Sequence, residues 1–256
     1  MESLSGKRGL VIGIASEKSI AYGCAQACQE EGAELAVTYL NDKALQHVRP
    51  LAEGLKVSND LILPFDVTHE GDLDAVIQKL SDTWGKVDFI IHAMASATKA
   101  MTRSRLIDVP LEDFNFAMEV SCHSFLAVAK AAEQLLSGDG VIVTMTYLGG
   151  KRVMPHYQFM GPMKAALESC VRYVANELGP QNIRIHAISA GAIPTRAASG
   201  IEDLDGLLDV TQTRSPLGRL CTPKDVGALA AFLVSPAAVA MTGSIYYVDG
   251  GYNIMG

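Results

Sequence analysis

Short apolar runs alternate with longer amphipathic stretches along the whole chain. The amphipathic stretches have helical length, for example at residues 20–32 and 73–85. The apolar runs are rich in Val and Ile, are bounded by Gly, Asp or Asn, and occupy residues 8–14, 33–39, 60–66, 87–94, 140–146, 183–189 and 244–251. Strands that are apolar along almost their whole length are typical of a parallel sheet covered by helices on both faces. The pattern therefore predicts a doubly wound α/β fold with a parallel sheet of about seven strands.

The alternation contains no internal repeat or linker, so we expect a single domain over residues 1–256. One stretch breaks the rhythm, because residues 191–222 combine several Gly and Pro residues with weak helical patterns. In folds of this class, ligands bind beyond the carboxyl ends of the strands. A long irregular insertion that follows a strand predicts a substrate lid over about residues 191–222.

Composition and charge narrow the functional classes. Of the 256 residues, 49% are hydrophobic, which is ample for one packed core. The net charge of −7 argues against a nucleic-acid or membrane-surface partner, because such partners require a basic surface. The longest apolar run, residues 226–241, is interrupted by Ser235 and Pro236 and is too short for a membrane span, and no signal peptide is recognised. The five cysteines show neither CxxC nor zinc spacing, so we expect no metal site and a reducing, cytoplasmic location.

The turn after the first predicted strand has features of a dinucleotide-binding site. Such a site requires a tight turn in which the backbone approaches a pyrophosphate, with the amides of a helix N-terminus pointing at it. The usual G-x-G-x-x-G pattern is absent, but Gly13 suits the tight turn and Ala15 takes a small-residue place. Ser16 and Ser19 can offer hydroxyls to phosphate, and Ser19 also suits the N-cap of a helix that begins near Ile20. A well-capped turn without a ligand explains the same residues, so both interpretations stay open at this point.

The ends of the second and third predicted strands would face the adenosine half of a dinucleotide. An acidic residue after the second strand binds the ribose, whereas a basic cluster favours a 2′-phosphate. Leu40 and Asn41 provide neither, and Lys43 is the only cation nearby, which favours NADH and leaves NADPH open. Asp66, after the third strand, suits a hydrogen bond to the adenine amino group and also a cap for the following helix.

Two tyrosines and two lysines lie within residues 147–164. Tyr147 and Lys151 have the four-residue spacing that is common for a Tyr and Lys on one helix in short-chain dehydrogenases. We reject this pair because Tyr147 directly follows a predicted strand. Gly149 and Gly150 also lie between the two residues and disfavour a helix.

Tyr157 and Lys164 form a better pair. Seven residues are nearly two helical turns, so both side chains share one face over about 10 Å of rise. Gly161 between them carries no side chain, and we expect it to leave room for a ribose ring that the lysine holds while the phenol points at the substrate. Pro162 is tolerated in a first helical turn but not in a helix interior. Either the helix starts near Gly161 with Tyr157 on its approach, or the helix is kinked.

Longer motifs around these residues carry a resemblance to a known family. They are GIASEKSIAYG at 13–23, TYLGG at 146–150, VMPHYQFMGPMKAALE at 153–168, VRYVANELGP at 171–180, IRIHAISAG at 183–191 and YYVDGGYNI at 246–254. Over essentially the whole chain, the sequence resembles the NADH-dependent enoyl-acyl-carrier-protein reductases, which are divergent short-chain dehydrogenases of fatty-acid synthesis with a Rossmann-type fold. The spacing of Tyr157 and Lys164, preceded by a second tyrosine, is the most selective of these motifs.

The resemblance implies a role for each matching residue. Tyr157 is the donor to a developing oxyanion, Lys164 is the cofactor anchor, and Tyr147 is the second catalytic tyrosine. The expected cofactor-binding residues are Gly13, Ser19, Ile20, Leu40, Asp66, Val67, Met94, Lys164, Ile193 and Thr195. The expected substrate-binding residues are Ala97, Tyr147, Tyr157, Met160 and Arg196.

The resemblance also implies a cofactor and partners. These are NADH, an acyl-carrier protein bearing an enoyl thioester, and further copies of the chain in a homotetramer. Because carrier proteins are acidic, a chain with a net charge of −7 needs a local cationic rim for docking. Scattered surface charges explain the same residues equally well. The candidates for this rim are Lys99, Arg103, Arg105, Lys151, Arg152 and Arg196.

Three departures from the family pattern leave other substrates open, and one of them is Leu40, where the family often has a polar residue near the adenosine. After the fourth predicted strand the chain reads HAMASAT from His92, and AIPTRA places Arg196 where the family has an apolar residue that would face the acyl chain. The alternatives are a carbonyl or other ene reductase on the same scaffold, or a nucleotide-sensing protein without catalysis. A ketoreductase favours a lysine four residues after the tyrosine, where this chain has Gly161. A sensor has no need to retain both Tyr157 and Lys164.

We expect structural and not catalytic roles for three histidines. His156 precedes Tyr157 but has no nucleophile to serve, so we expect a surface histidine at the start of a helix. His92 and His123 are expected in the core or behind the active residues.

Overall fold

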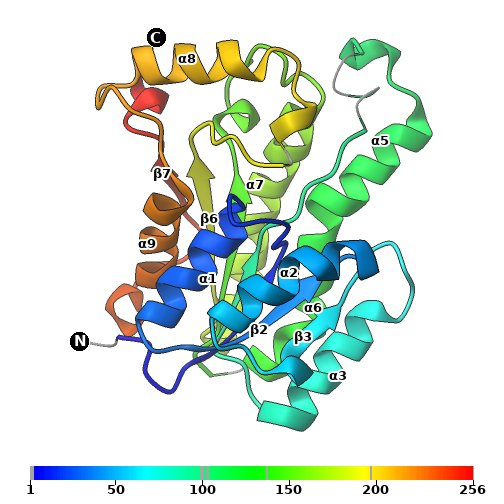
Figure 1. The fold of residues 1–256 in the computed structure, drawn as a ribbon, viewed down its shortest axis with the longest axis vertical. Helices are drawn as coiled ribbons and strands as arrows, with labels where there is room; N and C mark the ends of the chain where they lie inside the picture. Colours follow the sequence, from blue (N-terminus) through cyan, green and yellow to red (C-terminus); the bar gives the residue numbers. More distant parts are fainter. Residues whose placement is uncertain (1–2, 99–100, 102–103, 137, 197, 256) are drawn as a thin grey trace.

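Seven parallel strands form one sheet in the computed structural model, which describes residues 3–98, 101, 104–136, 138–196 and 198–255 (Figure 1). The strand order is β3-β2-β1-β4-β5-β6-β7, so the order reverses between β1 and β4. In doubly wound folds this reversal marks the ligand crevice. All seven predicted strands are present, as β1 (Arg8–Ile12), β2 (Glu34–Tyr39), β3 (Ile62–Pro64), β4 (Phe89–His92), β5 (Val141–Thr146), β6 (Arg184–Ala190) and β7 (Ile245–Val248).

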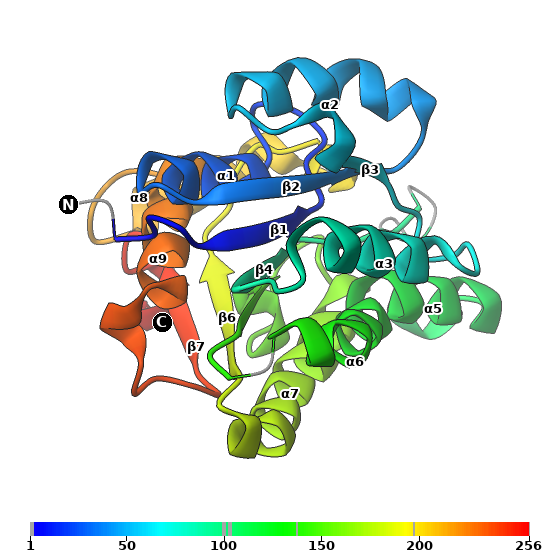
Figure 2. The ribbon, with the colours of Figure 1, turned by 90° about the horizontal axis from the view of Figure 1, so that it is seen from below.

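Helices cover both faces of the sheet. One face carries α1 and α9, and the opposite face carries α3, α6 and α7 (Figure 2). The α-helices are α1 (Ile20–Glu30), α2 (Asp42–Gly54), α3 (Asp72–Trp84), α5 (Leu111–Met118), α6 (Ser124–Leu136), α7 (Met160–Leu178), α8 (Leu204–Arg214) and α9 (Pro223–Val234). A π-helical turn, η3 (Glu119–His123), joins α5 to α6. Short 3₁₀ turns are η1 (Asn59–Leu61), η2 (Leu106–Asp108), η4 (Leu148–Gly150), η5 (Gly179–Gln181), η6 (Ala198–Gly200), η7 (Pro236–Ala238) and η8 (Tyr252–Ile254).

The core lies between the sheet and these helices. Every residue of β5 and β6 is buried, as the continuous apolar runs predict for central parallel strands. On the face of the sheet that carries α1 and α9, two glycines allow these two helices to pack closely. A Cβ built at Gly23 would lie 2.2 Å from the carbonyl oxygen of Pro223, and one at Gly227 would lie 2.2 Å from that of Gly23. Larger residues at either position would force the two helices apart.

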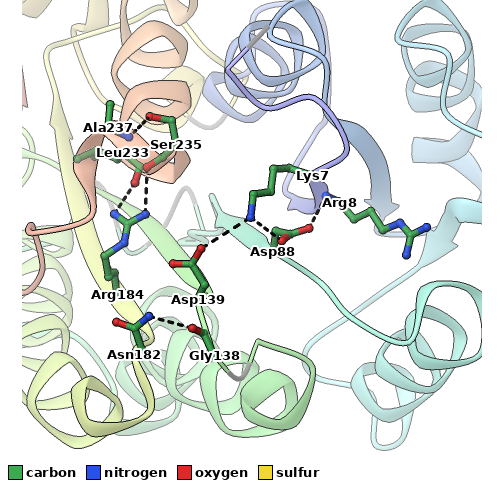
Figure 3. A network of polar contacts seen from close by, with 10 residues as sticks. All are labelled: Lys7, Arg8, Asp88, Gly138, Asp139, Asn182, Arg184, Leu233, Ser235 and Ala237. Atoms are coloured by element: carbon green, nitrogen blue, oxygen red, sulfur yellow. Dashed lines mark hydrogen bonds and ion pairs between the residues drawn. The ribbon is translucent and has the colours of Figure 1, made fainter.

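Hydrogen bonds and ion pairs stabilise the amino-terminal edge of the sheet (Figure 3). The ammonium of Lys7 donates to the carboxylate of Asp88 at 3.0 Å. The buried guanidinium of Arg184, at the start of β6, donates to the carbonyl of Leu233 at 2.7 Å and to that of Ser235 at 3.3 Å. These contacts hold the amino-terminal edge and leave the opposite, carboxyl-terminal edge for a ligand site.

The predicted lid region contains more regular structure than the sequence indicated. Residues 198–214 include η6 and the helix α8, which lies beyond the carboxyl end of β6 (Figure 1). The N-cap of α8 is Asp203, whose side chain accepts from the amide of Gly206 at 3.2 Å. The prediction of a long irregular insertion is therefore wrong for this part, because a capped helix satisfies its backbone groups.

The start of α7 decides between the two alternatives for Pro162. The helix begins at Met160, so Pro162 lies in its first turn, where an amide has no acceptor within the helix. Tyr157 lies on the approach, and its carbonyl accepts from the amide of Gly161 at 3.0 Å. The first alternative is correct, and no kink is required. Within the described residues no helix is long and apolar enough to cross a membrane.

Candidate functional site

A cavity of about 510 Å³ opens at the carboxyl ends of β1, β4, β5 and β6. It reaches from the turn after β1 to the start of α7 and is covered on one side by the 198–207 region. The structure therefore brings together all the residues that were expected to bind the cofactor or the substrate, although their roles stay predictions. Those residues are Gly13, Ser19, Ile20, Leu40, Asp66, Val67, Met94, Ala97, Tyr147, Tyr157, Met160, Lys164, Ile193, Thr195 and Arg196.

The turn after β1 is built around Gly13 and Ser19. Gly13 has a φ of +107°, and a Cβ there would lie 2.2 Å from the carbonyl oxygen of Ala93, so only glycine fits. Ser19 is the N-cap of α1 by position, as predicted, but its side chain makes no capping bond. Its hydroxyl oxygen instead accepts from the amides of Ala15 at 3.0 Å and Ser16 at 2.9 Å. The hydroxyl thus closes the turn, and Ser16 itself is not among the residues that line the cavity.

The N-terminus of α1 supplies donors at this end of the cavity. Ile20 and Ala21 form the first turn of the helix and both line the cavity. Amides in a first helical turn have no acceptor within the helix, and the helix dipole adds positive potential there. This end therefore suits a phosphate group.

The other end of the cavity carries Leu40 and Asp66. Leu40 is 55% exposed, and Lys43 does not line the cavity. One carboxylate oxygen of Asp66 accepts from the amide of Thr68 at 3.0 Å and from its hydroxyl at 2.7 Å. The helix α3 begins only at Asp72, so the prediction that Asp66 caps it is wrong. Asp66 closes a local turn instead, because the chain between β3 and α3 is longer than the sequence pattern indicated.

The glycine pair between the two tyrosines lets their rings meet. The rings of Tyr147 and Tyr157 pack edge to face, with centroids 4.7 Å apart. A Cβ at Gly149 would lie 2.4 Å from Cδ1 of Tyr157 and 3.3 Å from Cδ1 of Tyr147. A Cβ at Gly161 would lie 3.0 Å from the carbonyl oxygen of Gly149. The prediction that Gly161 leaves room for a ribose is therefore wrong, because this space is filled by the backbone of η4.

Both phenols are kept in their neutral form by burial. Burial raises the pKa of Tyr157 above its ordinary value, and the neighbouring Tyr147 raises it further. Burial also raises the pKa of Tyr147, with smaller contributions from Tyr252 and Asp249. The hydroxyl of Tyr147 is buried and has no hydrogen-bond partner among the described residues. A buried hydroxyl without a partner is costly, so this one is suited to meet a ligand.

Lys164 lies on the second turn of α7 and is only 5% exposed. Its ammonium donates to the carbonyl of Met145 at 2.9 Å, which leaves two further N–H bonds. Burial lowers its pKa to about 8, against the opposing pull of Cys122 and Glu168. The charged ammonium is therefore the main form of Lys164 at neutral pH. Few other cations among the described residues line the cavity.

The alternative Tyr147–Lys151 pair is not formed. Tyr147 has an extended backbone and precedes a 3₁₀ turn, so no helix joins it to Lys151. The ammonium of Lys151 lies 5.3 Å from the ring centroid of Tyr247. The rejection of this pair from the sequence is confirmed.

A buried carboxylate supports the helix that carries Lys164. Glu168 is one turn further along α7 and accepts from the hydroxyl of Thr146 at 2.8 Å. A Cβ at Gly150 would lie 3.0 Å from a carboxylate oxygen of Glu168. The sequence did not single out Glu168 or Thr146, although Thr146 directly precedes Tyr147.

The histidines occupy different environments. His92 is fully buried and is bonded through Nδ1 to the Thr144 hydroxyl and through Nε2 to that of Ser124, both at 2.9 Å. Burial, with the nearby charge of Lys164, lowers the pKa of His92 to about 3, so it is neutral. His123 is exposed, so its predicted place in the core is wrong.

His156 lies just before the active region and is partly exposed, as expected. It stands 3.6 Å from the carboxylate of Glu202, in the lid region.

Comparisons with known proteins agree with a dinucleotide-binding site of this kind. A family model described as enoyl-(acyl carrier protein) reductase matches residues 13–253. The chain belongs to this reductase family. The NADH enoyl-acyl-carrier-protein reductase 2 of Rhizobium meliloti is 44% identical to it, over 98% of this chain and 93% of the relative.

Solved structures of other family members have the same fold. The enoyl-acyl-carrier-protein reductase of Anaplasma phagocytophilum, solved in complex with NAD, is 42% identical with a TM-score of 0.95, covering 99% of this chain and 96% of that chain. The reductase of Bacillus cereus, solved with NADP⁺ and indole naphthyridinone, is 39% identical with a TM-score of 0.97, covering 100% of both chains.

This member of the reductase family has an apolar cavity wall that the sequence analysis missed. Ile201, Leu204 and Leu207 come from the lid region, and Phe116 and Val120 come from α5 and the π-helical turn. Leu204 and Leu207 are three residues apart, which is the spacing of neighbours on one helix face. That spacing was the available signal, but the glycine between them obscured the helix.

The cations expected to form a docking rim have different surroundings, as far as the described residues show. Arg196 lines the cavity, whereas Arg105 stands 3.7 Å from Asp108. Arg152 donates to the carbonyl of Met255. Lys99 and Arg103 lie outside the described residues.

Proposed function

We propose that this chain reduces the carbon–carbon double bond of a 2-enoyl thioester carried by acyl-carrier protein, with NADH as the reductant, in fatty-acid elongation. The observation that carries the proposal is the convergence of Tyr157 and Lys164 in one cavity that also receives the N-terminus of α1. Membership of the reductase family supports it. The whole of residues 1–256 acts as one catalytic unit.

The residues present fit a dinucleotide. The N-terminus of α1 offers amides to the pyrophosphate, and the buried ammonium of Lys164 offers its remaining donors to the hydroxyls of the nicotinamide ribose. No cation lines the adenosine end, and the lining cations among the described residues are Lys164 and Arg196, which favours NADH over NADPH. When bound, NADH supplies a hydride to the β-carbon of the enoyl group.

Tyr157 stabilises the charge that develops on the substrate. Addition at the β-carbon of a conjugated thioester moves negative charge to the thioester oxygen. A neutral phenol is a preorganised donor for that oxygen, and the buried ammonium of Lys164 adds positive potential in the same cavity. The unpartnered hydroxyl of Tyr147 provides a second donor beside the first. Protonation of the α-carbon then completes the reduction.

The space around Gly161 argues against ketoreductase chemistry. That chemistry favours a lysine four residues after the tyrosine, at position 161. A Cβ at this position would already lie 3.0 Å from the carbonyl oxygen of Gly149, so a lysine there would require the η4 turn to move. The cation of this site comes instead from Lys164, one turn further on.

Substrate comparison tests the proposal. We expect NADH to be consumed with crotonyl and longer enoyl thioesters, and NADPH to be used less efficiently. A 3-ketoacyl thioester serves as the matched control, and we expect little turnover with it. Turnover of the keto compound alone would overturn the assignment, and binding of NADH without turnover of either compound would favour a nucleotide sensor.

We further propose a cytoplasmic homotetramer. Large apolar side chains that do not line the cavity are exposed on several helices, including Leu111 on α5, Tyr173 on α7 and Phe232 on α9. Exposed apolar groups on several elements support contacts with other copies of the chain. Light scattering after size-exclusion chromatography tests this, and a monomer at micromolar concentration would contradict it.

A further inference from the structure

The π-helical turn η3 (Glu119–His123) forms part of the cavity wall. π-Helical turns are rare, and they occur frequently at functional sites. Val120 of this turn lines the cavity, and Ser121 beside it is fully buried. The resemblance-based site residues include neither of these positions.

Ser121 binds the backbone of one residue in an adjoining segment of the cavity wall. Its hydroxyl oxygen accepts from the amide of Ser96 at 3.1 Å, and the hydroxyl lies 3.3 Å from the carbonyl oxygen of the same residue, to which it donates. Ser96 belongs to the segment 93–97, which follows β4 and lines the cavity. We propose that Ser121 is a positioning residue that fixes this wall segment for the reaction. This inference rests on the proposed function.

The segment is held at its other end by the same region of the chain. Ser124 donates to the carbonyl of Val120 at 2.7 Å and accepts from Nε2 of His92, at the end of β4. The amide of Ala93 also donates to the carbonyl of Ile12 in β1, at 3.0 Å. The start of the segment is therefore anchored independently of Ser121, and Ser121 controls its far part.

The far part of the segment is the substrate side of the wall. Ala97 directly follows Ser96 and packs in an apolar cluster with Phe159 and Met160. Met160 lines the cavity at the start of α7. Met94, expected at the cofactor, lies nearer the anchored end. Loss of the Ser121 hydroxyl should therefore disturb the substrate more than the cofactor.

The test combines binding, kinetics and hydrogen exchange. For Ser121→Ala we expect KM for crotonyl thioester to rise ~10-fold, the order expected for two lost hydrogen bonds, with the Kd for NADH within about twofold of wild type. Ser121→Cys keeps the shape of the side chain with a slightly larger atom and a weaker donor, and should give an intermediate KM. Amide exchange at Ser96 should accelerate in Ser121→Ala.

The matched control is Ser235→Ala. Ser235 is also buried, and its hydroxyl likewise accepts from one amide, that of Ala237, and donates to one carbonyl, that of Phe232. It lies at the amino-terminal edge of the sheet, away from the cavity (Figure 3). We expect this variant to lose stability while its KM stays that of wild type.

The outcomes separate the two proposals. A wild-type protein without enoyl reduction contradicts the proposed function. An active wild type whose KM is unchanged in Ser121→Ala, or whose NADH affinity falls in parallel, overturns the role of Ser121. If Ser121→Ala does not fold, rapid exchange of the Ser96 amide in the wild-type protein still overturns it.

Discussion

Substitution of Gly149 by alanine tests how closely the two tyrosines are held. The backbone φ of Gly149 lies outside the left-handed region, so alanine can adopt it. The new Cβ would lie 2.4 Å from Cδ1 of Tyr157, whereas ordinary contact begins at 3.4 Å. The Tyr157 ring and the η4 backbone must therefore separate by about 1 Å. Cδ1 lies next to the atom that attaches the rigid ring of Tyr157 to its Cβ. The contact therefore cannot be relieved by rotating the flexible end of a side chain.

The magnitude follows from this displacement. A misplacement of about 1 Å at a reacting group costs ~10²-fold in rate. Overpacking of a packed site costs about 1–3 kcal/mol of stability, which a domain of this size tolerates. We therefore expect Gly149→Ala to remain folded and to reduce kcat about 100-fold, measured as loss of NADH absorbance with an enoyl thioester.

Two further glycines calibrate the effect. Gly54 ends α2, and a Cβ there meets nothing within 4 Å, so Gly54→Ala should keep wild-type kcat. At Gly150 the nearest atom is a carboxylate oxygen of Glu168 at 3.0 Å, so Gly150→Ala should give an intermediate loss. Wild-type kcat for Gly149→Ala would refute the reasoning, because it would mean that the position of the phenol does not matter.

Other perturbations separate catalysis from binding and stability. Tyr157→Phe should lower kcat ~10²–10³-fold and leave NADH binding intact in isothermal titration, whereas Lys164→Ala should damage both; equal loss of binding would contradict these roles. Because burial lowers the folded-state pKa of Lys164 from 10.5 to about 8, activity should fall as pH rises through about 8. Between pH 8 and 10.5 the unfolded chain binds more protons at Lys164 than the folded chain does, so the contribution of this residue to the free energy of unfolding should rise with pH. A free energy of unfolding that fell together with the activity over this range would contradict the sign. Thr146→Val leaves the carboxylate of Glu168 without its donor and should cost about 1.5–3 kcal/mol in urea denaturation, and an unchanged midpoint would refute the contact. Thr222→Ala removes the capping box of α9 and should cost ~1 kcal/mol of stability with kcat unchanged, so a loss of activity would show that the cap reaches the site.

Much of the fold could be predicted because parallel strands bury both faces. The run that became β5 is apolar apart from its threonines, the run that became β6 is apolar or small apart from Arg184 and His186, and every residue of both strands is buried. The predicted strands are short and are bounded by Gly, Asp or Asn. These boundaries made it possible to predict which residues lie at the carboxyl-terminal edge of the sheet. The helix α8 was harder to predict, because Gly206 weakens its helical sequence pattern and its cap, Asp203, has a left-handed backbone that no periodicity reveals.

The candidate site was predictable as a set of residues but not as a set of contacts. Tyr157 lies just before α7 and Lys164 lies in its second turn, and their spacing limited where they could lie. The side chain of Ser19 could bond either forward into α1 or back into the turn, and the same residue type suits both. At Gly161 the sequence shows only that a side chain is missing. The tertiary structure decides that backbone, rather than a ligand, occupies the space.

The measurement that tests the central claim most directly is the fate of a label. NADH carrying deuterium at nicotinamide C4, on the face that is transferred, is incubated with the enzyme and crotonyl thioester, and the butyryl product is analysed by NMR. We predict one deuterium at the β-carbon and none from the cofactor at the α-carbon. Deuterium on a carbinol carbon, or a saturated product without label, would contradict the account.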